Sequence, residues 1–255
     1  MEGNGDTTLL RGGLLVDGTG APARPGDVFV RGGRIESIGD TPAEADSVVD
    51  CVGKVVAPGF IDAHSHMDFF SASGDPHHFD SFTAQGVTTF VGGNCGFSPF
   101  GISPSTAHRG LLENSLFKAG RETLDWNSFA EYTQVLEQLG LTHNFLYLVG
   151  HGAARTSLSG FEARPLRSTE YREMLDLLDR AMEEGAAGAA LGLQNKPRVF
   201  AKLDELDDGA RHGKKRAQLL TVHAKDSTCV WGAYPMVGFG RDRQRDAIED
   251  RGGLG

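Results

Sequence analysis

Two histidines, His64 and His66, stand at the end of an apolar segment, GFIDAHSHMD (residues 59–68). This segment predicts a β-strand, and side chains two residues apart in a strand point to the same face. A single histidine in a protein core is usually a structural residue with its own hydrogen bonds. Two imidazoles on one face at a strand end would crowd each other unless something binds both, so the pair indicates a metal site.

Cys95 lies in a glycine-rich segment directly after the apolar run VTTFVGG (87–93). A free cysteine is often only a small buried residue, but a thiolate at a strand end is also a good zinc ligand. His223 ends a further apolar run, AQLLTVHAKD (217–226). Three strand ends then deliver imidazoles and a thiolate towards one opening, and this donor set suits zinc. The sequence therefore predicts a Zn²⁺ site formed by His64, His66, Cys95 and His223.

Strands that alternate with helices must position these residues. The apolar runs that predict strands cover residues 59–68, 87–93, 144–152, 186–193 and 217–226. Alternating strands and amphipathic helices predict a parallel sheet. The polar residues fall at the C-terminal ends of the strands, which favours a (β/α) barrel of the TIM type over a doubly wound sheet.

The two clearest helical patterns have capping residues at both ends. One covers residues 168–185, with Ser168 or Thr169 as the N-cap and Gly185 as the stop. The other covers residues 127–140, and its signals are Asn127 or Ser128 at the start and Gly140 at the end.

The first 57 residues follow a different pattern of short β segments interrupted by Gly, Asp and Pro. This pattern predicts a small β unit, either a sandwich or a curled sheet. We therefore predict two domains, 1–57 and 58–255. The second has about 200 residues, whereas a complete TIM barrel typically needs about 250. We expect an incomplete barrel with about five of the eight βα units.

The composition excludes several classes of partner. The formal net charge of −9 argues against nucleic acid or an anionic membrane as the main partner. No apolar run approaches the roughly 18 to 20 residues of a membrane span, and the N-terminus does not resemble a signal peptide. The three cysteines are widely spaced, which argues against a disulfide framework. These features predict a cytoplasmic protein.

Several segments resemble the amidohydrolase superfamily, and within it the branch of the D-aminoacylases, or N-acyl-D-amino-acid deacylases. The similar segments are PGFIDAHSHMD, GNCG, LVGHGAAR, LLDRAMEEGAAGAALGL and VHAKD. The resemblance covers nearly the whole chain. It implies that His64 and His66 hold one metal position, that Cys95 bridges towards a second, and that His223 belongs to the second. It also implies zinc-dependent hydrolysis of the linear amide bond of N-acyl-D-amino acids, which yields a carboxylate and a free D-amino acid.

The chain departs from this family pattern at its C-terminal end. Members of the family have a further metal-binding histidine on the sixth strand and a catalytic aspartate after the eighth, whereas this sequence stops at Gly255. It therefore resembles a C-terminally truncated member, no catalytic residue is assigned, and residues 1–255 alone are expected to be close to inactive. Two alternatives remain: an amidohydrolase that acts on a cyclic amide or imide, and a non-catalytic N-terminal fragment or decayed paralogue.

His151 and Arg155, in the segment GHGAAR, follow the third predicted strand and are candidate substrate-binding residues. The guanidinium group of Arg155 could form a bidentate contact with a substrate carboxylate. The alternative is that Arg155 is simply a surface cation in a loop.

Overall fold

The structure is a computed structural model of the 255-residue chain. It describes residues 6–114, 123–193, 197, 200, 201, 205, 208 and 219–223. The chain divides into two compact units, Met1–Phe60 and Ile61–Gly255. This boundary lies three residues beyond the one that the sequence predicts.

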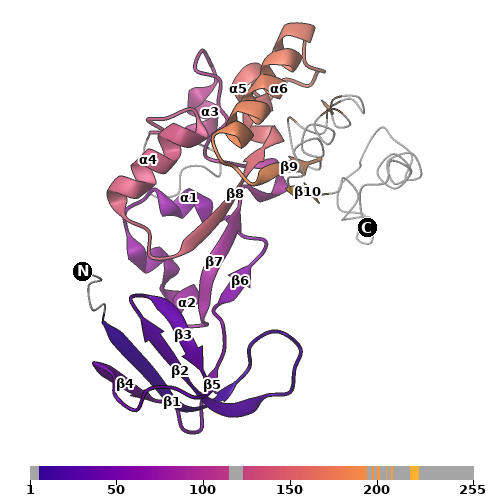
Figure 1. The fold of residues 1–255 in the computed structure, drawn as a ribbon. Coiled ribbons are helices and arrows are strands. Elements are labelled where there is room, and N and C mark those ends of the chain that lie inside the picture. The colour runs from indigo at the N-terminus through magenta and orange to yellow at the C-terminus, as the bar shows by residue number, and fades with distance from the viewer. Residues whose placement is uncertain are drawn as a thin grey trace. The chain divides into compact units, whose positions relative to one another are not determined.

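The strands of the first unit form one five-stranded sheet (Figure 1). They are β1 (Thr7–Leu15), β2 (Arg24–Arg31), β3 (Arg34–Ile38), β4 (Ser47–Asp50) and β5 (Val55–Val56). β1 pairs antiparallel with β2, and β2 pairs antiparallel with β3. On its other edge β1 pairs parallel with β4 and then with β5. Of the two arrangements predicted for this unit, the described strands therefore form a single sheet.

The second unit contains the sheet that carries the predicted ligands. Its strands are β6 (Phe60–Asp62), β7 (Val87–Gly92), β8 (Asn144–Gly150), β9 (Gly188–Gly192) and β10 (Leu219–His223). They lie in the order in which they occur in the sequence, and the β7–β8, β8–β9 and β9–β10 pairs are parallel. Each of the five predicted runs contains one of these strands, and the incomplete (β/α) barrel is confirmed.

Helices and short turns connect these strands. They are α1 (Asp68–Ser71), η1 (Pro76–Phe79), α2 (Asp80–Thr83), η2 (Asn94–Gly96), α3 (Arg109–Glu113), α4 (Phe129–Leu139), α5 (His151–Ser159) and α6 (Ser168–Glu183). α4 begins as predicted at Ser128, whose side chain accepts a hydrogen bond from the Glu131 amide while Glu131 reaches back to the Ser128 amide. It ends at Gly140. The N-cap of α6 is Arg167, one residue before the predicted cap.

A core of aromatic and aliphatic side chains joins helices α4 and α6 to strands β8 and β9. Tyr132 of α4, Met174 and Leu178 of α6, and Val149 of β8 are all fully buried in one cluster. Only one stripe of each helix contributes to it, as expected for amphipathic helices on the outside of a barrel sheet. This packing holds β8 and β9, two inner strands of the sheet that carries the metal-binding candidates on its other strands.

An ion pair anchors the start of α6. Glu170 accepts hydrogen bonds from Arg164 Nη1 at 2.6 Å and Nη2 at 2.8 Å, and from the Arg167 amide at 2.7 Å. The Arg164 hydrogen bond is the main reason that the pKa of Glu170 falls to about 2, below its usual value of 4.5. A carboxyl whose pKa is lower in the folded state stabilises the fold above its unfolded pKa. This contribution is lost as the pH falls from about 4.5 towards 2.

We predict that Glu170→Gln lowers the free energy of unfolding by about 1–3 kcal/mol at pH 7, because a charge-assisted pair is lost. The difference from the wild type should shrink between pH 4.5 and 3, because Glu170 takes up a proton in the unfolded chain, where its pKa is about 4.5, before it does so in the folded protein. Urea unfolding at several pH values measures both effects. The control is Glu137→Gln on the exposed face of α4, which should change little. A difference for Glu170→Gln that stays constant down to pH 3 would contradict the prediction.

Candidate metal centre

His64 and His66 lie just beyond strand β6, in the segment that leads into α1. The sequence placed them on the strand itself, but the chain turns after Asp62, whose carboxylate accepts the His64 amide hydrogen bond at 3.1 Å. Between them, the amide of the buried Ser65 donates a hydrogen bond to Val91 O at 3.3 Å, so this segment still lies against β7. The two histidine rings have centroids 6.0 Å apart and meet edge to face.

Cys95 lies in the turn η2, directly after β7. Among the described residues, Cys95 is the one non-glycine residue with a positive φ, of 56°. Gly93, two residues earlier, has a φ of 82°. Left-handed backbone is costly for a residue with a Cβ, so the surroundings must hold this turn in place. Cys95 is 9% exposed.

The Cys95 turn lies directly against the backbone of the neighbouring strands. A Cβ atom added at Gly192, the last residue of β9, would lie 1.8 Å from the carbonyl oxygen of Cys95. One added at Gly93 would lie equally close to the carbonyl oxygen of Leu148 in β8. Glycine at these two positions therefore lets the turn fold over the ends of β8 and β9.

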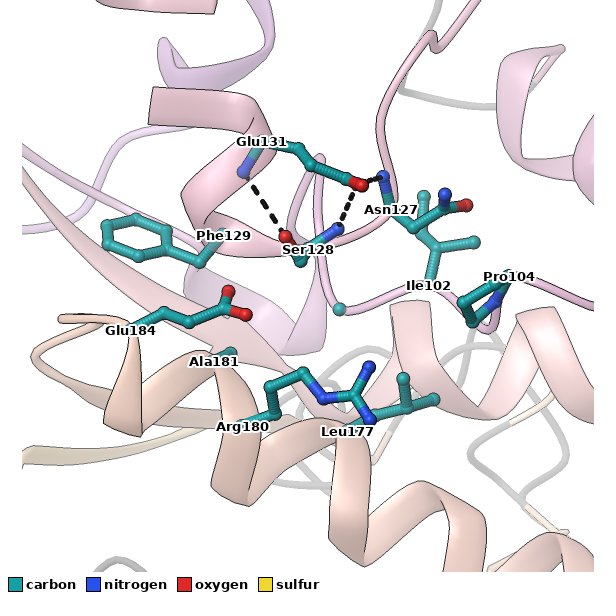
Figure 2. A pocket seen from close by; sticks show the side chains of 11 residues that line it. Ile102, Pro104, Asn127, Ser128, Phe129, Glu131, Leu177, Arg180, Ala181 and Glu184 are labelled. Atoms are coloured by element: carbon teal, nitrogen blue, oxygen red, sulfur yellow. Dashed lines mark hydrogen bonds between the residues drawn. The ribbon is translucent and has the colours of Figure 1, made fainter. Parts of the chain in front are cut away.

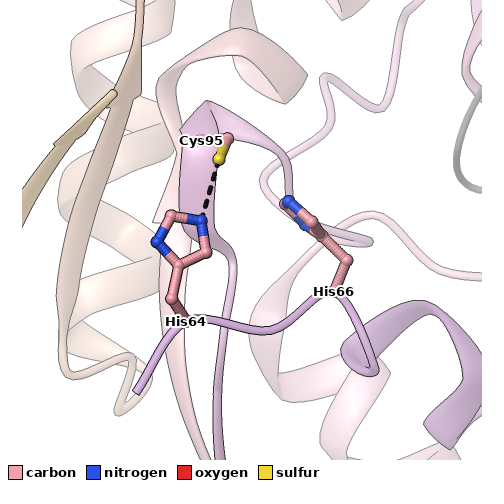
Figure 3. Close-up of side chains that lie close together, drawn as sticks. All are labelled: His64, His66 and Cys95. Carbon is pink, nitrogen blue, oxygen red and sulfur yellow. Dashed lines mark hydrogen bonds between the residues drawn. The ribbon is translucent and has the colours of Figure 1, made fainter. Parts of the chain in front are cut away.

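The structure brings the four predicted ligands together. Cys95 Sγ lies 3.1 Å from His64 Nε2 and 3.1 Å from His223 Nδ1. Ligand atoms of His64, His66 and Cys95 all lie within 4.8 Å of one another, and Figure 3 shows the three side chains turned towards a common space. Zinc binds nitrogen at about 2.0–2.1 Å and thiolate sulfur at about 2.3 Å. Neighbouring ligands of one ion therefore lie roughly 3–4 Å apart, and this arrangement fits a metal ion.

Asp68, two residues after His66, is fully buried beside this cluster. Its Oδ2 atom accepts a hydrogen bond from the Gly93 amide at 2.9 Å. Burial raises the pKa of Asp68 to about 7, although the hydrogen bond from Gly93 opposes that shift. The sequence predicts no role for this residue, because a carboxylate next to two histidines does not reveal which backbone amide it meets.

His151 and Arg155 lie in helix α5, and both are completely buried. Arg155 is therefore not a surface cation in a loop. Its Nη1 atom lies 2.6 and 2.8 Å from the two carboxylate oxygens of Glu205, and His151 Nε2 lies 2.9 Å from the first of them. Burial by itself would raise the pKa of Glu205, but these two partners outweigh it and the pKa lies below its usual value.

Arg155 also joins two further segments, because it donates to Pro197 O at 3.2 Å and to Arg164 O at 2.7 Å. Glu205 is not among the site residues that the sequence predicts. It lies 50 residues from Arg155 in the sequence, so no local signal could have placed its carboxylate next to α5.

A separate cavity of about 250 Å³ lies between the start of α4 and the C-terminal half of α6 (Figure 2). None of the predicted ligands lines it. Its two carboxylates, Glu131 and Glu184, accept hydrogen bonds from amides at or next to the start of α4. These contacts cap a helix and connect two outer helices, and the cavity has no link to the metal-binding candidates.

The described part of the chain contains no helix that is both long enough and apolar enough to cross a membrane.

Comparison with known proteins assigns the chain to a family. The sequence profile of the amidohydrolase family matches residues 47–243, about three quarters of the chain. The chain belongs to the amidohydrolase family. Among its relatives, N-acyl-D-glutamate deacylase of Alcaligenes xylosoxydans xylosoxydans is 36% identical over 222 residues. D-aminoacylase of the same organism is 34% identical over 221 residues. Each match covers 86% of this chain, and 43% and 44% of those proteins respectively.

Solved structures of amidohydrolases give the same result. A crystal structure of D-aminoacylase matches with a TM-score of 0.75 and 31% identity, over 86% of this chain and 45% of that one. N-acyl-D-glutamate deacylase from Bordetella bronchiseptica, in complex with zinc and a phosphonate inhibitor, matches with a TM-score of 0.72 and 34% identity. That match covers 87% of this chain and 45% of that one. The resemblance to D-aminoacylases is thereby confirmed. The chain spans about half the length of these relatives.

We predict that Gly192→Ala weakens metal binding, because the new methyl group would collide with the carbonyl oxygen of Cys95 and displace the turn. A displaced ligand should lower zinc affinity by at least about 10-fold, as changes around metal ligands typically do. Competition with a chromophoric chelator measures the affinity. Gly110→Ala in α3 is the matched control, since a Cβ there meets no atom within 4 Å. Equal zinc affinity in both variants would contradict the argument.

Proposed function

We propose that this chain carries the metal centre of a zinc-dependent amidohydrolase, which hydrolyses the linear amide bond of N-acyl-D-amino acids to a carboxylate and a free D-amino acid. The convergence of His64, His66 and His223 on the Cys95 sulfur is the observation that carries the proposal. The names of the relatives supply the substrate class: N-acyl-D-glutamate, N-acyl-D-aspartate and N-acyl-D-amino acids in general.

In this proposal each of the four ligands has a position. His64 and His66 would hold one metal position and His223 a second. Cys95 would belong to both, since its sulfur lies 3.1 Å from His64 Nε2 and 3.1 Å from His223 Nδ1. Bound zinc supplies Lewis acidity, which polarises a carbonyl group and makes a water molecule more acidic. The residues of this chain orient the ion: the Cys95 turn fixes the sulfur, and the segment after β6 fixes the two histidines.

The buried network around Glu205 would form the wall of the site next to strand β8. The Glu205 carboxylate already neutralises Arg155, so we assign this arginine to holding the wall rather than to a substrate carboxylate. Breaking a buried pair by removing one partner typically costs about 3–5 kcal/mol, because the other charge is left without compensation. His151, the first residue after β8, remains our candidate for substrate contact.

We predict that Cys95→Ser abolishes tight zinc binding by residues 1–255, because a hydroxyl group is a far poorer zinc ligand than a thiolate. The expected loss of affinity is at least about 100-fold, above the usual effect of residues that only support a ligand. Cys51→Ser is the matched control: Cys51 is also a buried cysteine, but it lies in the first unit. Metal analysis after dialysis, together with chelator competition, gives the result. Zinc retention by Cys95→Ser would contradict the proposed ligand set.

We predict D-selective but slow hydrolysis by zinc-loaded residues 1–255. The test is amine release from N-acetyl-D-glutamate, with N-acetyl-L-glutamate as the control substrate. The resemblance to D-aminoacylases implies a catalytic aspartate after the eighth strand. A positioned general base of this kind typically contributes about 10²- to 10⁴-fold in rate. Residues 1–255 should be slower by about that factor than the same chain extended by the sixth to eighth barrel strands. Ring opening of a cyclic imide by the extended protein would favour the alternative activity, and zinc binding without any turnover would favour the non-catalytic alternative.

A further inference from the structure

We propose that Asp68 is a positioning residue for Cys95: its carboxylate holds the Gly93 amide and thereby fixes the turn that presents the sulfur. The inference rests on the proposed metal site, because it concerns how that site is built. Asp68 itself is not proposed as a ligand or as a catalytic group.

The turn that carries Cys95 has a strained backbone conformation. Gly93, Cys95 and Gly96 all have positive φ angles, of 82°, 56° and 72°. Left-handed backbone costs roughly 1–2 kcal/mol at a residue with a Cβ, so contacts outside the turn must hold Cys95 in this conformation. Asp68 supplies one at the first of these residues, through the 2.9 Å hydrogen bond from the Gly93 amide to its Oδ2 atom.

Asp68 also fits closely against the end of β7. A Cβ atom added at Gly92 would lie 2.6 Å from Asp68 Cβ and 2.9 Å from its carboxyl carbon. The carboxyl group therefore lies directly on the strand end from which the turn departs. An apolar side chain could fill this space, but it would leave the buried Gly93 amide without an acceptor.

Hydrogen bonds to its backbone hold Asp68 itself in place. Its backbone carbonyl oxygen accepts hydrogen bonds from Ser71 Oγ and from the Tyr132 hydroxyl, both at 2.7 Å. The Tyr147 hydroxyl in turn donates to Ser71 Oγ at 3.4 Å. Tyr132 belongs to α4 and Tyr147 to β8, so hydrogen bonds from the core of the second unit hold the backbone of Asp68. Ser71, Tyr132 and Asp68 are all buried.

The same short segment therefore serves two ligands. His66 lies two residues before Asp68 and offers its imidazole to the metal position, while Asp68 holds the turn that carries the thiolate. A displacement of this segment would move both ligands together. In this way a single carboxylate fixes the separation between His66 and Cys95.

Cobalt replaces zinc in the test, because a bond between Co²⁺ and a thiolate gives a charge-transfer band in the near ultraviolet. We compare wild-type residues 1–255 with Asp68→Asn, which retains an acceptor oxygen, and Asp68→Ala, which does not. Asp68→Asn should keep the band and bind cobalt within about threefold of the wild type. Asp68→Ala should weaken the band and lower the affinity by about 10- to 100-fold, the range typical for groups that orient metal ligands.

Two further measurements separate positioning from general loss of stability. Met174→Ala removes a fully buried side chain from α6, so it should destabilise the fold but keep the wild-type cobalt band. In the metal-free protein, the Gly93 amide should exchange with solvent slowly in the wild type and in Asp68→Asn, and faster in Asp68→Ala. If Asp68→Ala does not fold, Asp68→Leu fills the space without an acceptor and takes its place, with the same expected losses.

The outcomes distinguish this inference from the proposed function. A wild-type protein that gives no thiolate–cobalt band would contradict the metal site itself. A wild-type band that persists at full strength and affinity in Asp68→Ala or Asp68→Leu would overturn the role of Asp68 and leave the metal site standing. Loss of the band in Asp68→Asn with unchanged Gly93 exchange would also overturn it, since it would show that the charge and not the acceptor matters.

Discussion

The site depends on a direct contact between backbone atoms: the Cys95 turn lies on the ends of strands β8 and β9 with no side chain in between. At Gly192 the space that a Cβ would need is occupied by the carbonyl oxygen of Cys95, and at Gly93 by that of Leu148. Interiors are close-packed, so a turn in such contact cannot shift by an ångström without moving the strands. The sheet therefore limits where the Cys95 turn can lie, and the hydrogen bond from Gly93 to Asp68 would hold the turn, and with it the sulfur, at that place.

The order of the strands explains how residues far apart in the sequence meet there. His64 and His66 follow the first strand of the second unit, Cys95 follows the second, and His223 ends the fifth. In a parallel sheet the C-terminal ends of all strands lie at the same edge, and a curled sheet brings the first and fifth strands towards a common axis. Buried side chains then refine the arrangement, with Asp68 at the Cys95 turn and the Arg155–Glu205 pair beside strand β8.

Local pattern was enough to predict the sheet and the ligand candidates, because strand periodicity and helix caps depend on nearby residues. Ser128 is the N-cap of α4 and Gly140 its C-cap, as expected. The contacts that hold the site depend on residues distant in sequence, and no local pattern encodes them: Asp68 meets an amide 25 residues away, and Arg155 a carboxylate 50 residues away. For the same reason the sequence left a surface position possible for Arg155, since nothing near it in the sequence indicates its buried partner Glu205.

Metal binding would also connect two strands of the second unit's sheet that are not neighbours, since Cys95 follows β7 and His223 ends β10. Cys95 and His223 are 128 residues apart in the sequence, and their ligand atoms are 3.1 Å apart. The entropy that closing a loop removes from the unfolded chain grows with loop length, as about 3/2 RT ln n. A metal link between residues 128 positions apart would therefore remove considerable freedom from the unfolded chain. Strand β10 needs such a link, because its ladder to β9 is its one strand pairing among the described residues and its first residue, Leu219, is 52% exposed. Since a ligand set rarely exists in an unfolded chain, the free energy of metal binding is also free energy of folding. The centre that would carry the chemistry would thus also hold the last described strand in the sheet.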